Sequence, residues 1–166
     1  SLVDFGSGFF LGIPQPAILM LLIYAIGAAV LTYTSFGRLV TAIGSNEEAV
    51  RLSGVPVERY VLSVYVISGA LAAVAGIVAA GRTGIGTPQV GVGAELDVIA
   101  AVVIGGASLM GGRGGMFNTL LGALILGIIT NIMNLAGVPG YHQNVYLGLI
   151  IILAMLIQFV TARSRR

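Results

Sequence analysis

The sequence predicts an all-α membrane protein, a polytopic transmembrane helical bundle with about five membrane-crossing segments. Three observations support this fold class. Hydrophobic residues make up 57% of the chain and charged residues only 8%, and the mean hydropathy is +1.04. A soluble domain carries roughly 25% charged residues, so this chain cannot cover an apolar core with a polar surface. Long stretches also lack any charged side chain, as in residues 5–37, 60–81 and 114–162.

The apolar stretches predict where the helices lie. Because a bilayer crossing needs about 20 apolar helical residues, we expect helices near residues 16–36, 61–80, 97–110, 116–135 and 145–160. The third segment is short. At 1.5 Å per residue it reaches only about 22 Å, so it either crosses beside polar loops or forms a re-entrant half-helix.

The basic residues predict the orientation of the bundle. All eight Lys and Arg residues are Arg, and if all five segments cross, seven share one side while Arg82 lies opposite. The positive-inside rule makes that shared side the cytoplasm and places the C-terminus there. A re-entrant third segment would move Arg113 and the basic tail outside, so we favour five crossings. The net charge of +2 needs no nucleic-acid partner, and the tail is interpreted as a topology anchor.

A charged segment separates the first two predicted crossings. Six of the fourteen charged residues lie within residues 38–59. This segment is too charged for hydrocarbon, and in the favoured orientation it forms a cytoplasmic loop over residues 37–60. We expect a short helix at residues 46–53 of this loop. From the residues alone, that helix is either a surface connector or a docking helix for a cytoplasmic partner.

The short helix has its own start and stop signals. Ser45 stands three residues before Glu48, the spacing of a capping box in which hydroxyl and carboxylate satisfy each other's backbone N–H groups. Arg51 falls in the last turn, Gly54 at the position after the C-cap, and Pro56 blocks continuation. These signals predict a self-contained helix.

Four segments resemble signatures of one family, the permeases of ABC importers for sugars such as ribose, galactose or xylose. They are "GIPQP" at residues 12–16, "GRLVTAIGSNEEAVRLSGV" at 37–55, "ELDVIAAVVIGGASLMGGRGG" at 95–115 and "NTLLGALILGIITNIMNLAGV" at 118–138. The resemblance covers nearly the whole chain, with Asn118 where the family often has glycine. It implies the C-terminal part of a permease subunit in a bacterial inner membrane, a transport subunit with no enzymatic activity of its own.

The resemblance also implies a role for the charged segment, which in that family seats in a groove of the ATP-hydrolysing subunit. Glu48, Ala49 and Gly54 match the Glu-Ala and Gly of the permease motif, whereas Val50 replaces its second Ala. The residues expected to couple to the ATPase are Asn46, Glu47, Glu48, Ala49, Arg51, Leu52 and Gly54. The implied partners are cytoplasmic ABC ATPase subunits, an extracytoplasmic sugar-binding protein, a second permease copy forming a homodimer, and membrane lipid. No cofactor or metal is expected.

A polar stripe runs along the predicted helix 116–135. At about 100° per residue, small and polar side chains fall on one arc, opposite Ile125, Ile128 and Ile132. The stripe consists of Thr119, Ala123, Gly127, Thr130 and Asn134, with Asn131 at its edge. Neutral hydroxyls and amides suit the lining of a sugar pathway, with Thr119, Thr130, Asn131 and Asn134 as the candidates. The alternative is hydrogen bonding between helices, worth about 0.6 kcal/mol on average in membranes.

Glycine is abundant, at 25 residues, which favours close helix approach. Small residues at four-residue spacing occur in the pairs Gly69/Ala73, Ala72/Gly76 and Ala123/Gly127. The glycine-rich residues 105–115 lack the Lys-Ser/Thr of a phosphate-binding loop, so no nucleotide site is assigned.

Few other residues carry chemistry. The chain has no cysteine, which excludes disulfides and thiolate metal sites. Glu95 and Asp97 precede a helix and are interpreted as partners of its dipole, and His142 is interpreted as a polar residue of an external turn. Two other functions remain open: a branched-chain amino-acid permease, similar in architecture, and an ion-coupled secondary carrier, which would need an ionisable residue in mid-membrane. A membrane enzyme has the least support.

Overall fold

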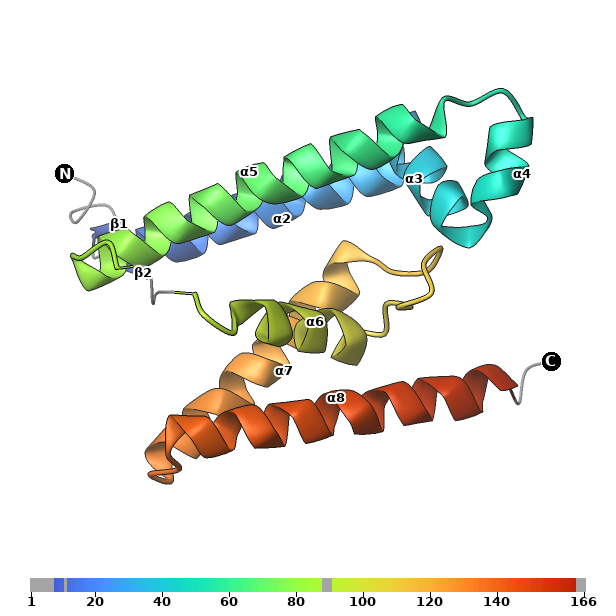
Figure 1. Ribbon diagram of the computed structural model, residues 1–166. Coiled ribbons are helices and arrows are strands. Elements are labelled where there is room, and N and C mark those ends of the chain that lie inside the picture. The colour runs from blue at the N-terminus through green and yellow to red at the C-terminus, as the bar shows by residue number, and fades with distance from the viewer. Residues whose placement is uncertain (1–7, 11, 88–90, 164–166) are drawn as a thin grey trace. The chain divides into compact units, whose positions relative to one another are not determined.

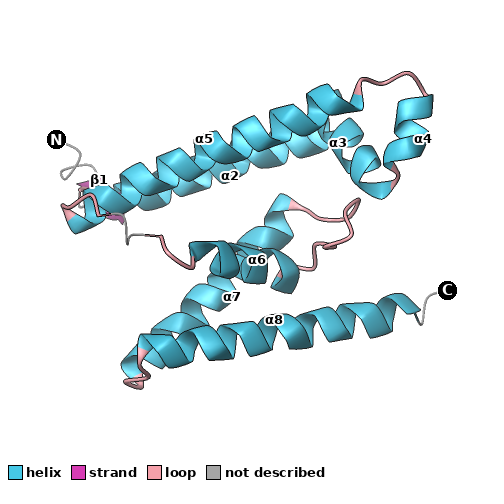
Figure 2. Ribbon diagram, viewed as in Figure 1, coloured by secondary structure: helices cyan, strands magenta, loops and turns pink. Residues whose placement is uncertain are grey.

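The computed structural model describes residues 8–10, 12–87 and 91–163 (Figure 1). The chain divides into two compact units, Ser1–Val92 and Gly93–Arg166. Apart from one pair of two-residue strands, every regular element in the described residues is a helix (Figure 2). The predicted all-α class is therefore confirmed.

The first unit begins with the strand pair β1 (Phe9–Phe10) and β2 (Ile13–Pro14), which is antiparallel and pairs Phe10 with Ile13. Four helices follow: α2 (Gln15–Tyr33), α3 (Ser35–Ser45), α4 (Glu47–Leu52) and α5 (Val57–Thr83). The expected helix 16–36 thus ends three residues early, and the expected helix 61–80 begins four residues early.

The early end of α2 has a local cause at Thr34. The Thr34 backbone is extended, and its side chain caps the next helix by accepting a hydrogen bond from the Gly37 N–H at 3.3 Å. The Thr34 hydroxyl also donates to the Val30 carbonyl at 2.6 Å. One threonine therefore ends α2 and begins α3, a helix absent from the sequence prediction, which treated residues 37–60 as a loop with a single short helix.

The second unit contains three helices, α6 (Ala94–Ile104), α7 (Met116–Leu135) and α8 (Gly140–Arg163). The helix predicted at 116–135 has the bounds observed for α7. α8 begins five residues before the expected start at 145, because the Pro139 carbonyl accepts bonds from the N–H groups of His142 (2.9 Å) and Gln143 (3.3 Å). His142 consequently lies in the first turn of α8, and its interpretation as a residue of an external turn is corrected.

The third predicted segment differs most from expectation. The helix expected at 97–110 is α6, which spans Ala94–Ile104 and gives way to turns over residues 105–115. Eleven residues rise only about 16 Å, roughly half the hydrocarbon thickness of a bilayer. Gly106, Gly111 and Gly112 have positive φ in these turns, a backbone that cannot continue a helix. α6 alone is therefore too short to cross, and the number of crossings remains a prediction.

α6 packs against both α7 and α8 in a small apolar core. The buried core residues are Ala100, Ala101, Leu126 and Leu147, with Ile104, Ala123 and Ile151 packed against them. A β carbon built on Gly122 would overlap the Ala101 carbonyl oxygen, and one built on Gly105 would overlap the Asn118 carbonyl oxygen. Because later residues of α6 meet earlier residues of α7, the two helices run antiparallel.

Three helices are long and apolar enough to cross a membrane: α2, α5 and α7. A further apolar helical segment, Gly140–Leu156 of α8, is shorter. No residue in the most apolar stretch of α2 or of α5 is fully buried within the described residues, although several α2 residues are half-buried, as expected for helices that contact lipid or other transmembrane segments.

Candidate functional site

The charged segment folds into a compact turn of helices, called here the elbow, which consists of α3, α4 and the first turn of α5. α3 contacts α2, α4 and α5. Its apolar residues recur at helical spacing, namely Phe36, Leu39, Val40 and Ile43, and all four are half-buried. The Phe36 ring lies 5.9 Å from the Tyr60 ring of α5, centroid to centroid. The missed helix α3 was thus visible in the sequence as this i, i+3, i+4, i+7 pattern.

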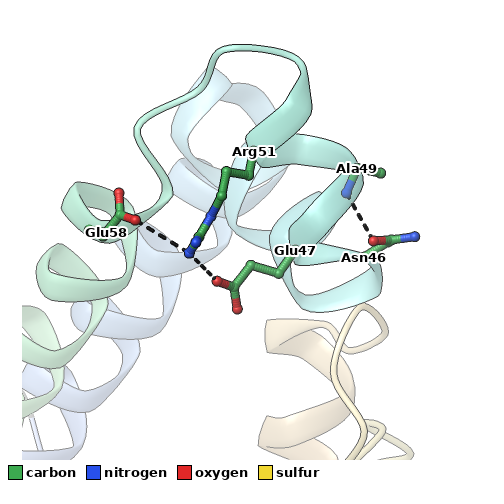
Figure 3. Close-up of polar contacts among 5 residues, drawn as sticks. All are labelled: Asn46, Glu47, Ala49, Arg51 and Glu58. Atoms are coloured by element: carbon green, nitrogen blue, oxygen red, sulfur yellow. Dashed lines mark hydrogen bonds and ion pairs between the residues drawn. The ribbon is translucent and has the colours of Figure 1, made fainter.

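The cap of α4 differs from the sequence prediction. Asn46, not Ser45, is the N-cap, and its Oδ1 accepts a hydrogen bond from the Ala49 N–H at 3.0 Å (Figure 3). The Ser45 hydroxyl instead donates to the Thr41 carbonyl at 3.2 Å, since Ser45 is the last residue of α3. The capping box of Ser45 and Glu48 is therefore wrong, although a short helix with acidic residues in its first turn and Arg51 in its last is confirmed.

Arg51 connects α4 to the long helix that follows it. One guanidinium nitrogen lies 2.8 Å from a Glu47 carboxylate oxygen and 3.3 Å from a Glu58 carboxylate oxygen (Figure 3). Glu47 is one turn away on α4, whereas Glu58 belongs to the first turn of α5. Glu58 was not among the predicted site residues, and helical spacing does not pair it with Arg51. Arg51 therefore links α4 to α5 through Glu58, and it links two successive turns of α4 through Glu47.

Gly54 follows the C-cap residue Ser53 of α4 and has a φ of +85°. A β carbon there would meet no atom within 4 Å, so space does not require glycine at this position. The left-handed backbone does, because it costs other L-residues roughly 1–2 kcal/mol. The predicted helix stop at Gly54 is confirmed.

The predicted coupling residues divide between two faces of α4. Glu47 and Arg51 lie on the side that bonds to α5, and Val50 is the only half-buried residue of the helix. Glu48 and Leu52 lie about 160° around the helix from Val50 at 100° per residue, and both are exposed. Leu52 is 83% exposed. α4 thus has an anchored side and a free side.

In the second unit the polar stripe of α7 is only partly covered by other helices: Gly127, Asn131 and Asn134 are exposed, and the buried residues of α7, Gly122 and Leu126, lie outside the stripe. Thr119, Ala123 and Thr130 are half-buried, whereas the opposite residues Ile128 and Ile132 are 60% and 59% exposed. The Thr119 hydroxyl bonds to the Gly115 carbonyl of its own helix at 3.1 Å. The stripe therefore combines local backbone bonds with packing inside the unit.

Asn134, at the end of the stripe, has a side-chain partner that the sequence analysis missed. Its Oδ1 accepts a hydrogen bond from Nε2 of Gln143 on α8 at 2.8 Å, and the same Gln143 nitrogen donates to the Val138 carbonyl at 2.8 Å. Gln143 is only 8% exposed. Asn131 is exposed, and among the described residues its side chain makes no hydrogen bond. Sequence spacing does not pair Asn134 with Gln143. The turn between α7 and α8 brings the two amide side chains together.

The remaining candidates show no further assembled site. Glu95 and Asp97 both lie in the first turn of α6, where carboxylates interact favourably with the helix dipole, as predicted. His142 is exposed with its ring 4.2 Å from that of Tyr141. Within the described ranges, His, Asp and Glu side chains nowhere form a group of three that could hold a metal ion.

Long apolar helices joined by a self-capped charged elbow define a polytopic helical membrane protein. The chain belongs to the family described as branched-chain amino acid transport system / permease component, which it matches over residues 1–158. It is 46% identical over 153 residues to the ribose import permease protein RbsC of Bacillus subtilis, covering 92% of this chain and 48% of that protein. No solved structure matches.

Two relatives from Escherichia coli K12 are also sugar permeases by name. The ribose import permease protein RbsC is 44% identical over 153 residues, covering 92% of this chain and 48% of the relative. The xylose transport system permease protein XylH is 43% identical over 152 residues, covering 92% and 39%. The chain thus spans about half the length or less of these relatives, and the resemblance to sugar permeases is confirmed.

Proposed function

We propose that this chain is part of the transmembrane permease subunit of an ATP-driven ABC importer that moves a monosaccharide across the bacterial inner membrane. The observation that carries the proposal is 43–46% identity to ribose and xylose permeases over nine-tenths of the chain. It corresponds to the C-terminal part of that subunit. The chain itself hydrolyses nothing; cytoplasmic ATPase subunits supply the energy, and an extracytoplasmic binding protein delivers the sugar.

The elbow is the proposed coupling element. Its central helix, α4, has its own cap at Asn46, its own stop at Gly54 and an ion-pair link from Arg51 to α5. A helix held at both ends can move as a rigid body and pass that motion to the helices on either side, which is the kind of motion alternating access requires. In this proposal the elbow, the residues 105–115 and the C-terminus lie in the cytoplasm.

The sugar pathway is proposed to include Thr119, Thr130, Asn131 and Asn134. These side chains are neutral hydrogen-bonding groups, which suit a polyol better than an ion. Asn131, which is exposed and unpaired among the described residues, is best placed to bond a passing hydroxyl. Asn134 combines this role with its bond to Gln143. A second permease copy, forming a homodimer, and lipid cover the apolar surfaces of the long helices.

A branched-chain amino-acid permease is the second candidate, because the family description names that cargo. Transport distinguishes the two. The complete transporter, with its full-length permease, ATPase and binding protein, is reconstituted in vesicles, and ATP-dependent uptake of labelled ribose, xylose and leucine is measured. Uptake of a pentose but not of leucine is expected. Leucine uptake alone would replace the proposal with the second candidate.

The coupling role is tested at Gly54 in the same vesicles. Gly54→Val places a β-branched residue in a left-handed backbone at a cost of about 1–2 kcal/mol, which corresponds to about a tenfold loss of the docked state. Gly54→Asn is the matched control, because asparagine tolerates this conformation. We expect the valine variant to insert normally but lose sugar uptake and retention of the ATPase. Glu48→Arg should act similarly, by reversing charge at the helix N-terminus. Full coupling in both Gly54→Val and Glu48→Arg would reduce the elbow to a connector.

A further inference from the structure

The turn between α7 and α8 has a backbone that is held in one conformation. Gly137 has a φ of +71°, and its N–H donates to the Asn134 carbonyl at 3.1 Å. The next N–H, that of Val138, donates to the Met133 carbonyl at 3.0 Å. These two bonds form a Schellman motif, which often ends a helix at a glycine. The Val138 carbonyl that follows the motif accepts a hydrogen bond from Gln143 Nε2 at 2.8 Å.

That carbonyl determines which way the Gln143 amide points. A carbonyl oxygen only accepts hydrogen bonds, so the Gln143 atom that faces it must be the nitrogen. Gln143 is almost fully buried and lies one turn before the core residue Leu147, which leaves its side chain little room to turn away. The Asn134 atom that lies 2.8 Å from the same nitrogen must then be its oxygen, because an amide nitrogen does not accept a hydrogen bond. The Asn134 Nδ2 group is therefore turned away from Gln143.

We infer that Gln143 is a positioning residue for sugar transport: it orients the Asn134 amide so that Asn134 presents an N–H donor, and not its oxygen, to the sugar. The inference rests on the proposed function and deepens it by assigning the polarity of one group in the pathway. Asn134 is exposed, and its Nδ2 makes no hydrogen bond among the described residues. The group that this donor recognises is an oxygen with a free lone pair, which every hydroxyl of a monosaccharide has.

An exposed asparagine does not define such a polarity by itself. Its amide can rotate by half a turn and offer either the oxygen or the nitrogen. Asn131 on the same helix is exposed and has no side-chain bond among the described residues, so it can offer either atom. Rotation of Asn134 would instead bring its NH₂ group against that of Gln143 and leave a buried N–H without an acceptor, which is unfavourable. The bond to Gln143 therefore holds Asn134 in one direction.

The test uses the complete transporter in vesicles and replacements of nearly identical shape. Asn134→Asp keeps an oxygen for Gln143 Nε2 but has no N–H to present. Gln143→Glu should reverse Asn134, because a glutamate faces it with an oxygen in either protonation state; when protonated, its single O–H bonds to the Val138 carbonyl. Asn144→Asp is the matched control, since it adds a carboxylate to the same turn of α8 at an exposed position without a side-chain bond among the described residues.

The readout must report polarity, because a sugar hydroxyl can both donate and accept. Fluorine accepts a hydrogen bond weakly and never donates, and hydrogen does neither. The pentose that the unmodified transporter takes up is therefore compared with its deoxyfluoro and deoxy forms at each carbon that bears a hydroxyl. We expect one carbon at which the deoxyfluoro form is taken up about twofold to fivefold faster than the deoxy form, as for a weak hydrogen bond.

Asn134→Asp and Gln143→Glu should abolish this ratio, and Asn144→Asp should preserve it. The binding protein is the same throughout, so its own preference cancels when permease variants are compared. Gln143→Met is the second replacement at this position, in case the glutamate prevents folding. It frees the Asn134 amide to rotate, so the ratio should fall toward one, whereas a merely structural role of Gln143 would lower the uptake of all probes by the same factor.

Each outcome bears on a different claim. A ratio that persists in Asn134→Asp would overturn the donor role of Asn134. A ratio that persists in both Gln143→Glu and Gln143→Met would overturn the positioning role of Gln143, and its loss in Asn144→Asp would assign the effect to added charge. If the unmodified transporter takes up a pentose but no carbon shows the ratio, this inference alone fails. If it takes up no pentose, the proposed function itself fails.

Discussion

Gly122 of α7 lies directly against the Ala101 backbone of α6, so close that any β carbon on Gly122 would overlap the Ala101 carbonyl oxygen. The same β carbon would lie 2.8 Å from the backbone nitrogen of Gly105. Both neighbours are main-chain atoms, of α6 and of its C-cap residue, and cannot rotate away as a flexible side chain can. The packing of α6 on α7 therefore depends on a glycine at position 122.

The first prediction is that Gly122→Ala destabilises the permease. Overpacking of a tight contact costs about 1–3 kcal/mol, because the two helices must separate. Gly127→Ala on the same helix is the matched control, since a β carbon there meets nothing within 4 Å and alanine favours helix. Thermal unfolding in detergent is the measurement. Equal melting temperatures for the two variants would mean that α6 and α7 accommodate the added methyl group at position 122 without loss of stability.

The second prediction concerns which residue caps α4. Asn46→Ala removes the acceptor of the Ala49 N–H and should destabilise the helix by about 0.5–2 kcal/mol. Ser45→Ala should leave α4 unaffected, because the Ser45 hydroxyl bonds within α3. Hydrogen exchange of the α4 amides distinguishes the two, with faster exchange expected only in Asn46→Ala. The reverse pattern would restore the capping box that the sequence predicts.

The third prediction separates structure from transport in the α7 stripe. Asn134→Leu leaves an N–H of the buried Gln143 amide without its acceptor, at a cost of about 1–3 kcal/mol, so both melting temperature and uptake should fall. Asn131→Leu should lower uptake while the melting temperature stays unchanged, because Asn131 is exposed and unpaired among the described residues. Normal uptake at limiting and saturating sugar in Asn131→Leu would remove it from the proposed pathway.

The fourth prediction is the topology. The chain has no cysteine, so single cysteines at exposed positions can be labelled once any others in the complete permease are replaced. Ser53→Cys and Met110→Cys should react with an impermeant reagent only from the cytoplasm, and Thr87→Cys only from outside, while every arginine is kept. Reaction of position 110 from outside would support a re-entrant α6 and overturn the five-crossing prediction.

The sequence alone predicted those features whose causes lie within a few residues. α7 has the expected bounds of 116–135, because an apolar run there lies between glycine-containing turns. Gly54 ends α4 as expected because a left-handed stop is a local property. α3 was also predictable from the helical spacing of its apolar residues. The sequence analysis treated the whole charged segment as a loop and therefore missed this helix. The end of α6 was missed because residues 105–110 continue the charge-free run of the helix, although Gly105 and Gly106 mark its stop.

Tertiary structure decided which residues meet, and sequence spacing does not encode this. Asn46 and Ser45 are both good caps, and only the continuation of α3 through Ser45 left the role to Asn46. The small-residue spacing that pointed to Gly69, Gly76 and Gly127 identified glycines with open space around them, whereas Gly122 makes the close contact. Glycine has no side chain whose chemistry could indicate its neighbour. The link from Arg51 to Glu58 and that from Asn134 to Gln143 each cross a turn, and only the path of the backbone through that turn brings the two side chains within bonding distance.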